Sequence, residues 1–282
     1  MQIDEPAIDA AAAESGFTGV VAIDGGDQRL FERCCGFANR AAGVPNTADT
    51  RFALASGSKT FTALAVWKPT DYVLTVPVHE LAETSGFPPM LAGRPQKYAP
   101  GERFGYCNQG FVVLALVIER VAGTGFHEFV QTQVFDPAGL TRTGFLRSDD
   151  LPRNAALGYF EKTGNHTNVL HLPVRGNGDG GAYSTVGDLH RFWQAVLAGR
   201  IAGPDLVAEV IRPRNDVPEE GMRYAAGLWL HATGPQLIMA GYDAGVSMRS
   251  VHDPASGTTV TVLSNSSQGA GPVINLVQGL FD

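Results

Sequence analysis

Segments with the composition of β-strands lie at both ends of the chain, and helix-forming segments lie between them. Near the N-terminus, residues 17–23 and 30–37 predict two strands around the hairpin turn Asp24-Gly25-Gly26-Asp27. Near the C-terminus, four further strands are predicted in succession, at residues 224–230, 236–240, 246–252 and 258–263. Successive short strands with no helix between them favour an antiparallel sheet, so both ends of the chain are expected to contribute to one sheet.

The middle of the chain is predicted to be mostly helical. Apolar periodicity, ended by glycine or proline, predicts helices at residues 56–66, 109–122, 126–135, 184–197 and 204–211, with two more near the termini at 8–15 and 272–281. The expected fold class is α+β: an antiparallel sheet built from both termini and flanked by helices, with an inserted helical region. We expect a sheet domain of residues 1–55 and 215–282, a helical region of residues 56–214, and the active site at their junction.

The charge balance excludes several classes of partner. Only 17% of the residues are charged and the net charge is −7, which disfavours nucleic-acid binding because that binding depends on basic residues that neutralise phosphates. The longest apolar run, residues 111–118, is far shorter than the ~18 residues that a membrane span needs. The acidic N-terminus lacks the pattern of a signal peptide, so we expect a cytoplasmic protein or a trimmed secreted form. The oligomeric state stays open.

The pair Ser56 and Lys59 carries the first chemical signal. The two residues are three positions apart at a predicted helix start, so their side chains share one face of the helix. A lysine amine whose pKa is lowered by burial can take the proton of a serine hydroxyl, and a helix N-terminus offers N–H groups to a developing oxyanion. Taken alone, the spacing equally fits an N-cap serine beside a solvated lysine.

Rival catalytic motifs are absent. A phosphate-binding loop would need glycine where Ser58 and Ala53 stand, and the sequence has no Gly-x-Ser-x-Gly elbow. The pairs His79-Glu80 and His127-Glu128 lack the second histidine of a zinc-binding His-Glu-x-x-His motif. We therefore expect no metal site.

A second signal is Tyr106-Cys107-Asn108, directly before the apolar helix at 109–122. A tyrosine hydroxyl can relay a proton, and an asparagine amide can orient a carbonyl group. The same three residues also fit a packed tyrosine followed by a helix-capping asparagine.

Taken together, five stretches resemble motifs of the serine β-lactamase-like superfamily. That superfamily contains class C β-lactamases, D-alanyl-D-alanine peptidases, D-aminopeptidases and β-lactamase-like carboxylesterases. In chain order, the matching stretches are residues 52–63, Thr84-Ser85-Gly86, residues 106–111, residues 180–185, and the set Tyr224, Gly227, Leu228 and Trp229. The resemblance runs from about residue 17 to residue 265 and implies a β-lactamase/transpeptidase-like fold.

The resemblance also implies a mechanism and its residues. Ser56 would attack a carbonyl to form an acyl-enzyme, Lys59 and Tyr106 would share the general-base work, and Asn108 would hold the acyl-side amide or ester. The backbone N–H groups of Ser56 and Tyr242 would form the oxyanion hole. No metal or organic cofactor is implied, and the partner is a small ester or amide substrate.

Two departures from the family pattern bear on the substrate. Where the third motif carries lysine or histidine, the matching stretch is Met239-Ala240-Gly241, so glycine is kept and the cation is lost. The resemblance implies that Met239 and Gly241 lie at the substrate. Only 25 residues separate Lys59 from Ser85, about half the usual span. The leading hypothesis is a serine hydrolase of small, not strongly anionic esters or amides. The alternatives are a D,D-peptidase or β-lactamase, and a catalytically impaired binding protein.

Overall fold

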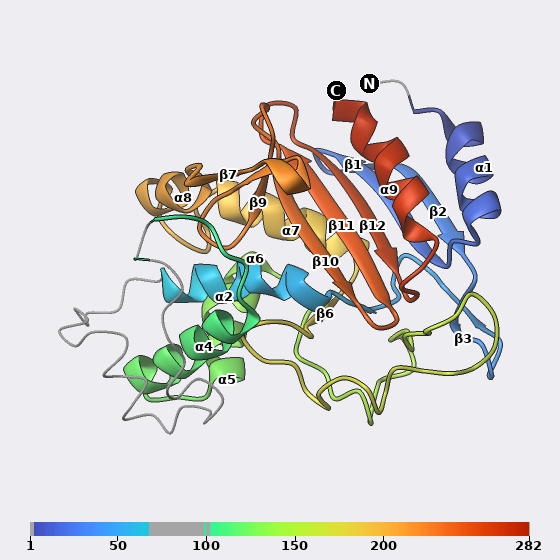
Figure 1. The fold of residues 1–282 in the computed structure, drawn as a ribbon, viewed down its shortest axis with the longest axis horizontal. Coiled ribbons are helices and arrows are strands. Elements are labelled where there is room, and N and C mark those ends of the chain that lie inside the picture. The colour runs from blue at the N-terminus through green and yellow to red at the C-terminus, as the bar shows by residue number, and fades with distance from the viewer. Residues whose placement is uncertain (1–2, 68–98, 100–101, 282) are drawn as a thin grey trace.

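The computed structural model describes residues 3–67, 99 and 102–281. Within them, eight strands form one antiparallel sheet in the order β2-β1-β12-β11-β10-β9-β8-β7 (Figure 1). The strands are β1 Gly19–Gly25, β2 Gln28–Cys35, β7 Asn215–Val217, β8 Met222–Tyr224, β9 Trp229–His231, β10 Leu237–Asp243, β11 Val246–Asp253 and β12 Thr258–Ser264. The α+β class with an antiparallel sheet is thus confirmed.

The two ends of the chain meet between β1 and β12. The N-terminal strand β1 pairs with β12 along its whole length, from Gly19 opposite Ser264 to Gly25 opposite Thr258. On its other side β1 forms the expected hairpin with β2. The predicted joining of both termini in one sheet is therefore correct.

Helices cover both faces of the sheet. On one face lie α1 (Glu5–Ser15) and α9 (Ala270–Gln278, continued by η5 Gly279–Phe281), side by side in Figure 1. An apolar cluster lies between these helices and the sheet and includes Ile8, Val21, Val262 and Val273. The opposite face packs against α7 (Val186–Leu197) and against η1 (Ala55–Ser58), which leads into α2 (Lys59–Val66).

The remaining elements form the predicted helical region and its connections. They are α4 Asn108–Ala122, α5 Phe126–Val130, the π-helical turn η3 Gln131–Phe135, α6 Asp136–Ala138, α8 Pro204–Ile211, η4 Pro218–Glu220, and the short strands β3 Phe37–Asn39, β4 Val44–Pro45, β5 Phe52–Ala53 and β6 Tyr183–Ser184. The helix expected at 126–135 therefore exists but changes to π geometry and continues to Ala138. The domain boundaries stay a prediction.

The prediction of one strand at residues 224–230 is wrong in its extent, because two short strands, β8 and β9, occupy this stretch. Gly227 lies between them with φ +88°. A Cβ on Gly227 would stand 2.2 Å from the Ala63 side chain, so the chain turns where it packs against α2. The edge strand β7 was not predicted.

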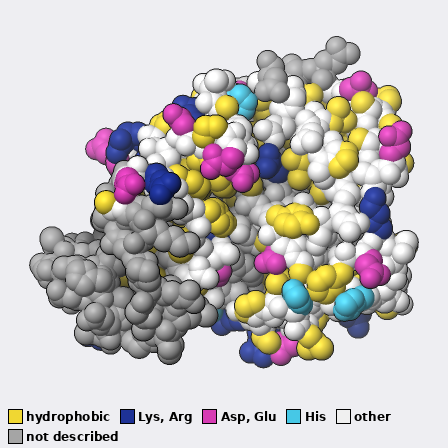
Figure 2. All heavy atoms as spheres, viewed as in Figure 1, with side chains coloured by type: hydrophobic (Ala, Val, Ile, Leu, Met, Phe, Trp, Pro, Cys, Tyr) yellow, Lys and Arg dark blue, Asp and Glu magenta, His cyan; other side chains and the backbone are white. Residues whose placement is uncertain are grey.

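Two features named in the sequence analysis lie wholly or mostly outside the described residues. They are the stretch Thr84-Ser85-Gly86 and the short segment between Lys59 and Ser85. In the described part of the chain, no single helix is long and apolar enough to cross a membrane, although the pair Asn108–Ala122 and Phe126–Ala138, bent by 83°, meets the length and composition criteria together. On the face seen in Figure 2, charged side chains of both signs are scattered among apolar and neutral ones.

Candidate active site

Ser56 lies in the 3-10 turn η1, which leads directly into α2. The residue before it, Ala55, has φ 45° and is the one non-glycine residue with positive φ in the part of the chain that the structure describes. Such strain persists only where the surroundings impose it, and it is concentrated at functional sites. Ala55 is buried, and its carbonyl accepts a hydrogen bond from the Gly181 N–H at 3.4 Å. The turn that presents Ser56 is thus tied to the backbone at Gly181.

Lys59 is buried directly beside the serine. Lys59 is only 3% exposed, and its Nζ donates to Ser56 Oγ at 3.0 Å and to the backbone carbonyl of Asp179. Burial lowers the pKa of Lys59 from 10.5 to about 8, and the negative charges of Asp179 and Asp243 partly oppose this shift. A substantial fraction of neutral amine is therefore present just above neutral pH, as a general base requires.

Tyr106 reaches the same hydroxyl from the segment before α4. Its side chain forms a hydrogen bond with Ser56, and its ring centroid lies 5.1 Å from Lys59 Nζ. Burial raises the pKa of Tyr106, although the Ser56 hydrogen bond acts in the opposite direction. The Tyr106 ring stacks on Trp229 at 6.3 Å, with 10° between the ring planes. The phenol therefore stays protonated near neutral pH and can donate a proton.

A glycine-rich loop fixes the far side of Lys59. Thr62 Oγ1 donates to the Gly178 carbonyl at 2.8 Å, and the Ala182 N–H donates to Ser58 Oγ at 3.0 Å. A Cβ on Gly178 would stand 2.1 Å from the Phe111 carbonyl oxygen, so only glycine lets this loop pass so close to α4. The loop thereby places Asp179 next to Lys59.

Gly241 lets β10 approach the turn that carries the serine. A Cβ at this position would lie 2.0 Å from the Leu54 carbonyl oxygen and 3.0 Å from the Gly57 nitrogen. Strand β9 pairs with β10 only at Leu237 and Ile238, so the edge of β10 beyond them faces the site without a partner strand.

The same free edge presents the N–H of Tyr242. The Gln236 carbonyl accepts from the His231 N–H on the β9 side at 3.0 Å, and backbone groups alternate sides along a strand. Tyr242 lies six residues further, so its N–H points toward the β9 side, where the edge is open. This is the geometry that an oxyanion donor from β10 needs.

Met239, expected at the substrate, is instead 1% exposed and belongs to the apolar core. A Cβ on Gly57 would stand 3.1 Å from Met239 Cγ and 3.0 Å from the Met248 sulfur, so both methionines fill the space beneath the residue that follows Ser56. Met239 lines neither of the two cavities at the site. Its apolar side chain occupies a position where the family pattern has a cation.

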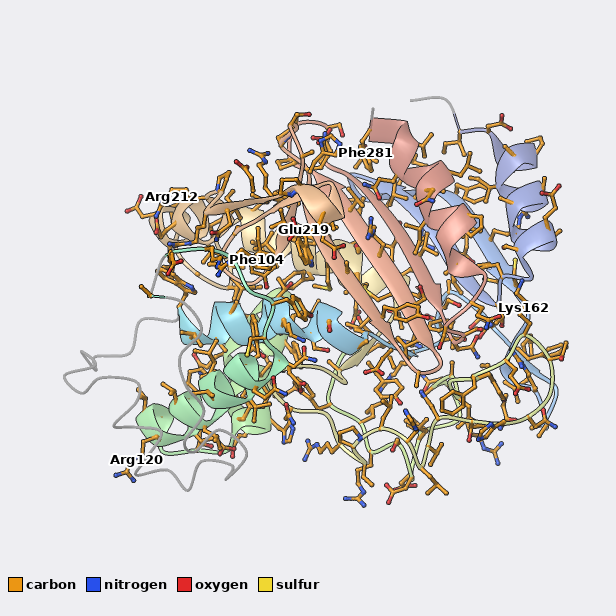
Figure 3. All side chains as sticks on the ribbon, in the orientation of Figure 1. Phe104, Arg120, Lys162, Arg212, Glu219 and Phe281 are labelled. Carbon is orange, nitrogen blue, oxygen red and sulfur yellow. The ribbon has the colours of Figure 1, made fainter. Side chains whose placement is uncertain are left out.

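Two cavities meet at Ser56, and Asn108, the first residue of α4, lines both. The smaller cavity, of about 100 Å³, is bounded by the glycine-rich loop and by Asp179 and Asp243. The larger cavity, of about 540 Å³, has an aromatic wall that includes Tyr106, Phe104 and Trp229, with Glu219 at its rim. Phe104 and Glu219, both labelled in Figure 3, line this cavity together with Ala240 and Gly241 of β10.

The structure thus brings together Ser56, Lys59, Tyr106, Asn108, Gly241 and Tyr242, and it buries Met239 nearby. In the sequence, Asp179 lies between Gly178 and Gly180, a setting typical of a turn, and this run of glycines is the only sequence signal for its place beside Lys59. Among the described residues, no group of three or more His, Cys, Asp or Glu side chains could hold a metal ion.

Comparison with known proteins places this site in context. A family model described as Beta-lactamase matches residues 5–69 and 75–278. The crystal structure of a penicillin binding protein from Bacillus halodurans has a TM-score of 0.84 and 30% identity, and the match covers 97% of this chain and 100% of that one.

Curated relatives match over shorter stretches. Penicillin-binding protein 4* of Bacillus subtilis is 28% identical over 232 residues, which cover 63% of this chain and 51% of that protein. A D-aminopeptidase of Brucella anthropi is 27% identical over 137 residues, which cover 49% of this chain and 26% of that protein. The chain therefore spans about half the length, or less, of these two relatives.

Proposed function

The chain belongs to the β-lactamase family, and from this membership we propose that it is a serine hydrolase that cleaves a small ester or amide through an acyl-enzyme on Ser56. One observation carries the proposal: the buried amine of Lys59 lies 3.0 Å from the Ser56 hydroxyl, and Tyr106 is hydrogen-bonded to the same group. A nucleophile, a base with a lowered pKa and a proton donor at one atom are the parts that acyl transfer needs.

The environment of Lys59 supports a role as the base in acylation. One amine hydrogen is engaged by the Asp179 carbonyl, so in the neutral amine the lone pair is free to face Ser56 Oγ. The serine proton moves to Lys59 as Oγ attacks the carbonyl carbon. Tyr106, whose raised pKa keeps it protonated, then donates a proton to the departing oxygen or nitrogen and is reprotonated through Lys59.

The negative charge of the tetrahedral intermediate falls on the former carbonyl oxygen. The N–H of Ser56 in the turn η1 and the N–H of Tyr242 at the open edge of β10 would donate to this oxygen. Asn108 would orient the acyl group, since its side chain lines both cavities. Water then enters, and the same base activates it for deacylation.

A D,D-peptidase or β-lactamase is the second candidate, favoured by the likeness to penicillin-binding proteins. Those activities act on substrates that carry a carboxylate, whereas in this chain Met239 is buried where the family pattern has a cation. The ester or amide hydrolase is therefore the better supported of the two.

Active-site labelling tests the proposal. The protein is incubated separately with a fluorophosphonate and with a fluorescent penicillin, and the adduct is located by mass spectrometry. We expect the fluorophosphonate on Ser56, and roughly a thousandfold or greater loss of p-nitrophenyl acetate turnover in Ser56→Ala. Labelling by both reagents would favour the peptidase. A folded protein labelled by neither, or a Lys59→Ala variant with full turnover, would contradict the assignment.

A further inference from the structure

Thr62 has no part in the proposed chemistry, yet its side chain reaches the loop that contacts Lys59. It lies on α2 three residues after Lys59, so both side chains share the helix face that meets the glycine-rich loop, residues 176–181. Thr62 is completely buried, and its Oγ1 donates to the Gly178 carbonyl at 2.8 Å. One position further along the loop, the Asp179 carbonyl accepts from Lys59 Nζ. Two side chains of one helix face therefore hold consecutive carbonyl groups of the loop.

The peptide group between Gly178 and Asp179 is held at both of its polar atoms. Thr62 holds the carbonyl oxygen, and Asn177 Oδ1 accepts a hydrogen bond from the Asp179 N–H at 3.1 Å. In the described part of the chain, Thr62 and Lys59 are the only residues outside the loop whose side chains hydrogen-bond to residues 177–179. Because a peptide group is planar, holding both of its polar atoms restricts where the following carbonyl, that of Asp179, can lie.

The position of the Asp179 carbonyl matters because the Lys59 amine has few partners. Of the residues that the structure describes, only Ser56, through Oγ, and Asp179, through its carbonyl, accept hydrogen bonds from it. In the neutral amine, the bond to Asp179 leaves the lone pair free to take the serine proton. In the charged amine, the same bond stabilises the ammonium group. A displaced Asp179 carbonyl would therefore lower both the rate of proton transfer and the pKa of Lys59.

We propose that Thr62 and Asn177 are positioning residues for the general base: they clamp the Gly178–Asp179 peptide group and so aim the Asp179 carbonyl at Lys59 Nζ. The inference rests on the proposed function, in which Lys59 takes the serine proton. Thr62 lines neither of the two cavities at Ser56, so it acts through the loop and not on the substrate.

Several charged and titratable groups face the Lys59 amine. They are Asp179 of the loop, Asp243 of β10, and Tyr106 and Cys107 before α4. Threonine, serine and valine carry no charge, so exchange among them at position 62 neither adds nor removes a charge near the amine. A displaced pH–rate profile in such a variant then reports a change in geometry around Lys59.

Isosteric variants on one helix test the proposal. Thr62→Val keeps the volume and removes the donor to Gly178. The rising limb of kcat/KM for p-nitrophenyl acetate should then move to lower pH by about half a unit or more, with a plateau roughly tenfold lower. Thr62→Ser keeps the hydroxyl and should behave like the wild type. The matched control is Thr60→Val, which removes a buried hydrogen bond of 3.1 Å from the same helix to the Gly227 carbonyl and should leave the limb in place.

Asn177→Ala releases the same peptide group from its N–H side. Asn177 is only partly buried, so this variant gives the test even where Thr62→Val does not fold, and its limb should move in the same direction. A limb that stays in place or moves to higher pH in both variants would overturn the positioning role. An equal displacement in Thr60→Val would overturn it as well, because the effect would then come from lost stability.

Labelling of Ser56 by a fluorophosphonate separates the two levels of failure. If the wild type is labelled at Ser56 and its kcat/KM rises with pH, an unmoved limb in both variants removes the positioning role and leaves the hydrolase standing. If folded wild-type protein is not labelled at Ser56, the proposed function fails, and the positioning role fails with it.

Discussion

The two faces of the central sheet are built from the same strands but differ in chemistry. The face toward α1 and α9 is apolar, whereas the face toward α7 and Ser56, called the polar face below, adds a row of buried polar groups to its apolar core. In β12, Val260 and Val262 point toward α1 and α9 and belong to an apolar cluster. The alternate residues Thr259 and Thr261 point the other way. Thr259 hydrogen-bonds to His190 of α7 at 2.6 Å, and Thr261 hydrogen-bonds to Ser250 at 2.9 Å, which in turn accepts from Trp193.

This difference separates the packing that stabilises the sheet from the hydrogen bonds that fix its position relative to the neighbouring elements. Apolar packing depends mainly on volume and tolerates exchange of similar side chains. Buried polar groups must each find a partner in the right place, so they fix relative positions more tightly. The polar face is the one on which β10 meets the turn that carries Ser56, and precise placement is what the chemistry at Ser56 requires.

The largest expected effect is a glycine-to-alanine change on the polar face. In Gly241→Ala, the new Cβ would stand 2.0 Å from the Leu54 carbonyl oxygen, so β10 must move away from Ser56. A displacement of this size costs catalysis far more than binding, and kcat/KM for p-nitrophenyl acetate should fall by about a hundredfold or more.

The matched control is Gly271→Ala in α9, on the apolar face. An added Cβ there meets nothing within 4 Å, so activity should be unchanged and the free energy of unfolding should rise by up to about 1 kcal/mol. Steady-state kinetics and urea unfolding on both variants check the pair. Equal activity in the two would mean that the close approach of β10 is not needed for turnover.

A smaller effect is expected on the free energy of unfolding when the pH is lowered, and its origin again lies on the polar face. His190 Nε2 donates to the Gly26 carbonyl at 2.7 Å, so in neutral His190 the Nδ1 atom accepts from the Thr259 hydroxyl. Thr259 Oγ1 then accepts from His252 Nδ1 at 2.8 Å. Burial is the main cause that lowers the pKa of His252 from 6.5 to about 4, and the charge that His190 carries when its ring is protonated acts in the same direction.

Because the folded pKa of His252 lies below the unfolded one, its neutral form is favoured in the fold. Its contribution is complete above pH 6.5 and is lost as the pH falls toward 4, by up to about 3 kcal/mol. Urea unfolding between pH 4 and 7 should show a shallower pH dependence in His252→Gln than in the wild type. His171→Gln, at an exposed position, serves as the control. Parallel curves for wild type and His252→Gln would exclude this origin of acid sensitivity.

Sequence patterns predicted the sheet and its helices well, because the period of apolar residues reports which face of an element is buried. The spacing of Ser56 and Lys59 and the position of Tyr106 were also accessible, since the first is local and the second lies at a helix start. Asp179 was not, because its place beside Lys59 depends on a loop held by Thr62 and Ser58 from a distant part of the chain. The only sign of such contacts in the sequence is the run of glycines in the loop.

The smallest predicted effect concerns the base itself. If Lys59 takes the serine proton, kcat/KM for p-nitrophenyl acetate should rise with pH and level off above an apparent pKa of about 8. The negative charge of Asp243 raises the pKa of Lys59, so Asp243→Asn should move the rising limb to lower pH. The shift should be less than about one pH unit, because Asp243 is exposed and solvent screens its charge. A pH–rate profile of the variant measures it beside Asp27→Asn, which removes one negative charge in the exposed turn between β1 and β2. A limb that stays in place or moves to higher pH would argue against Lys59 as the group that titrates.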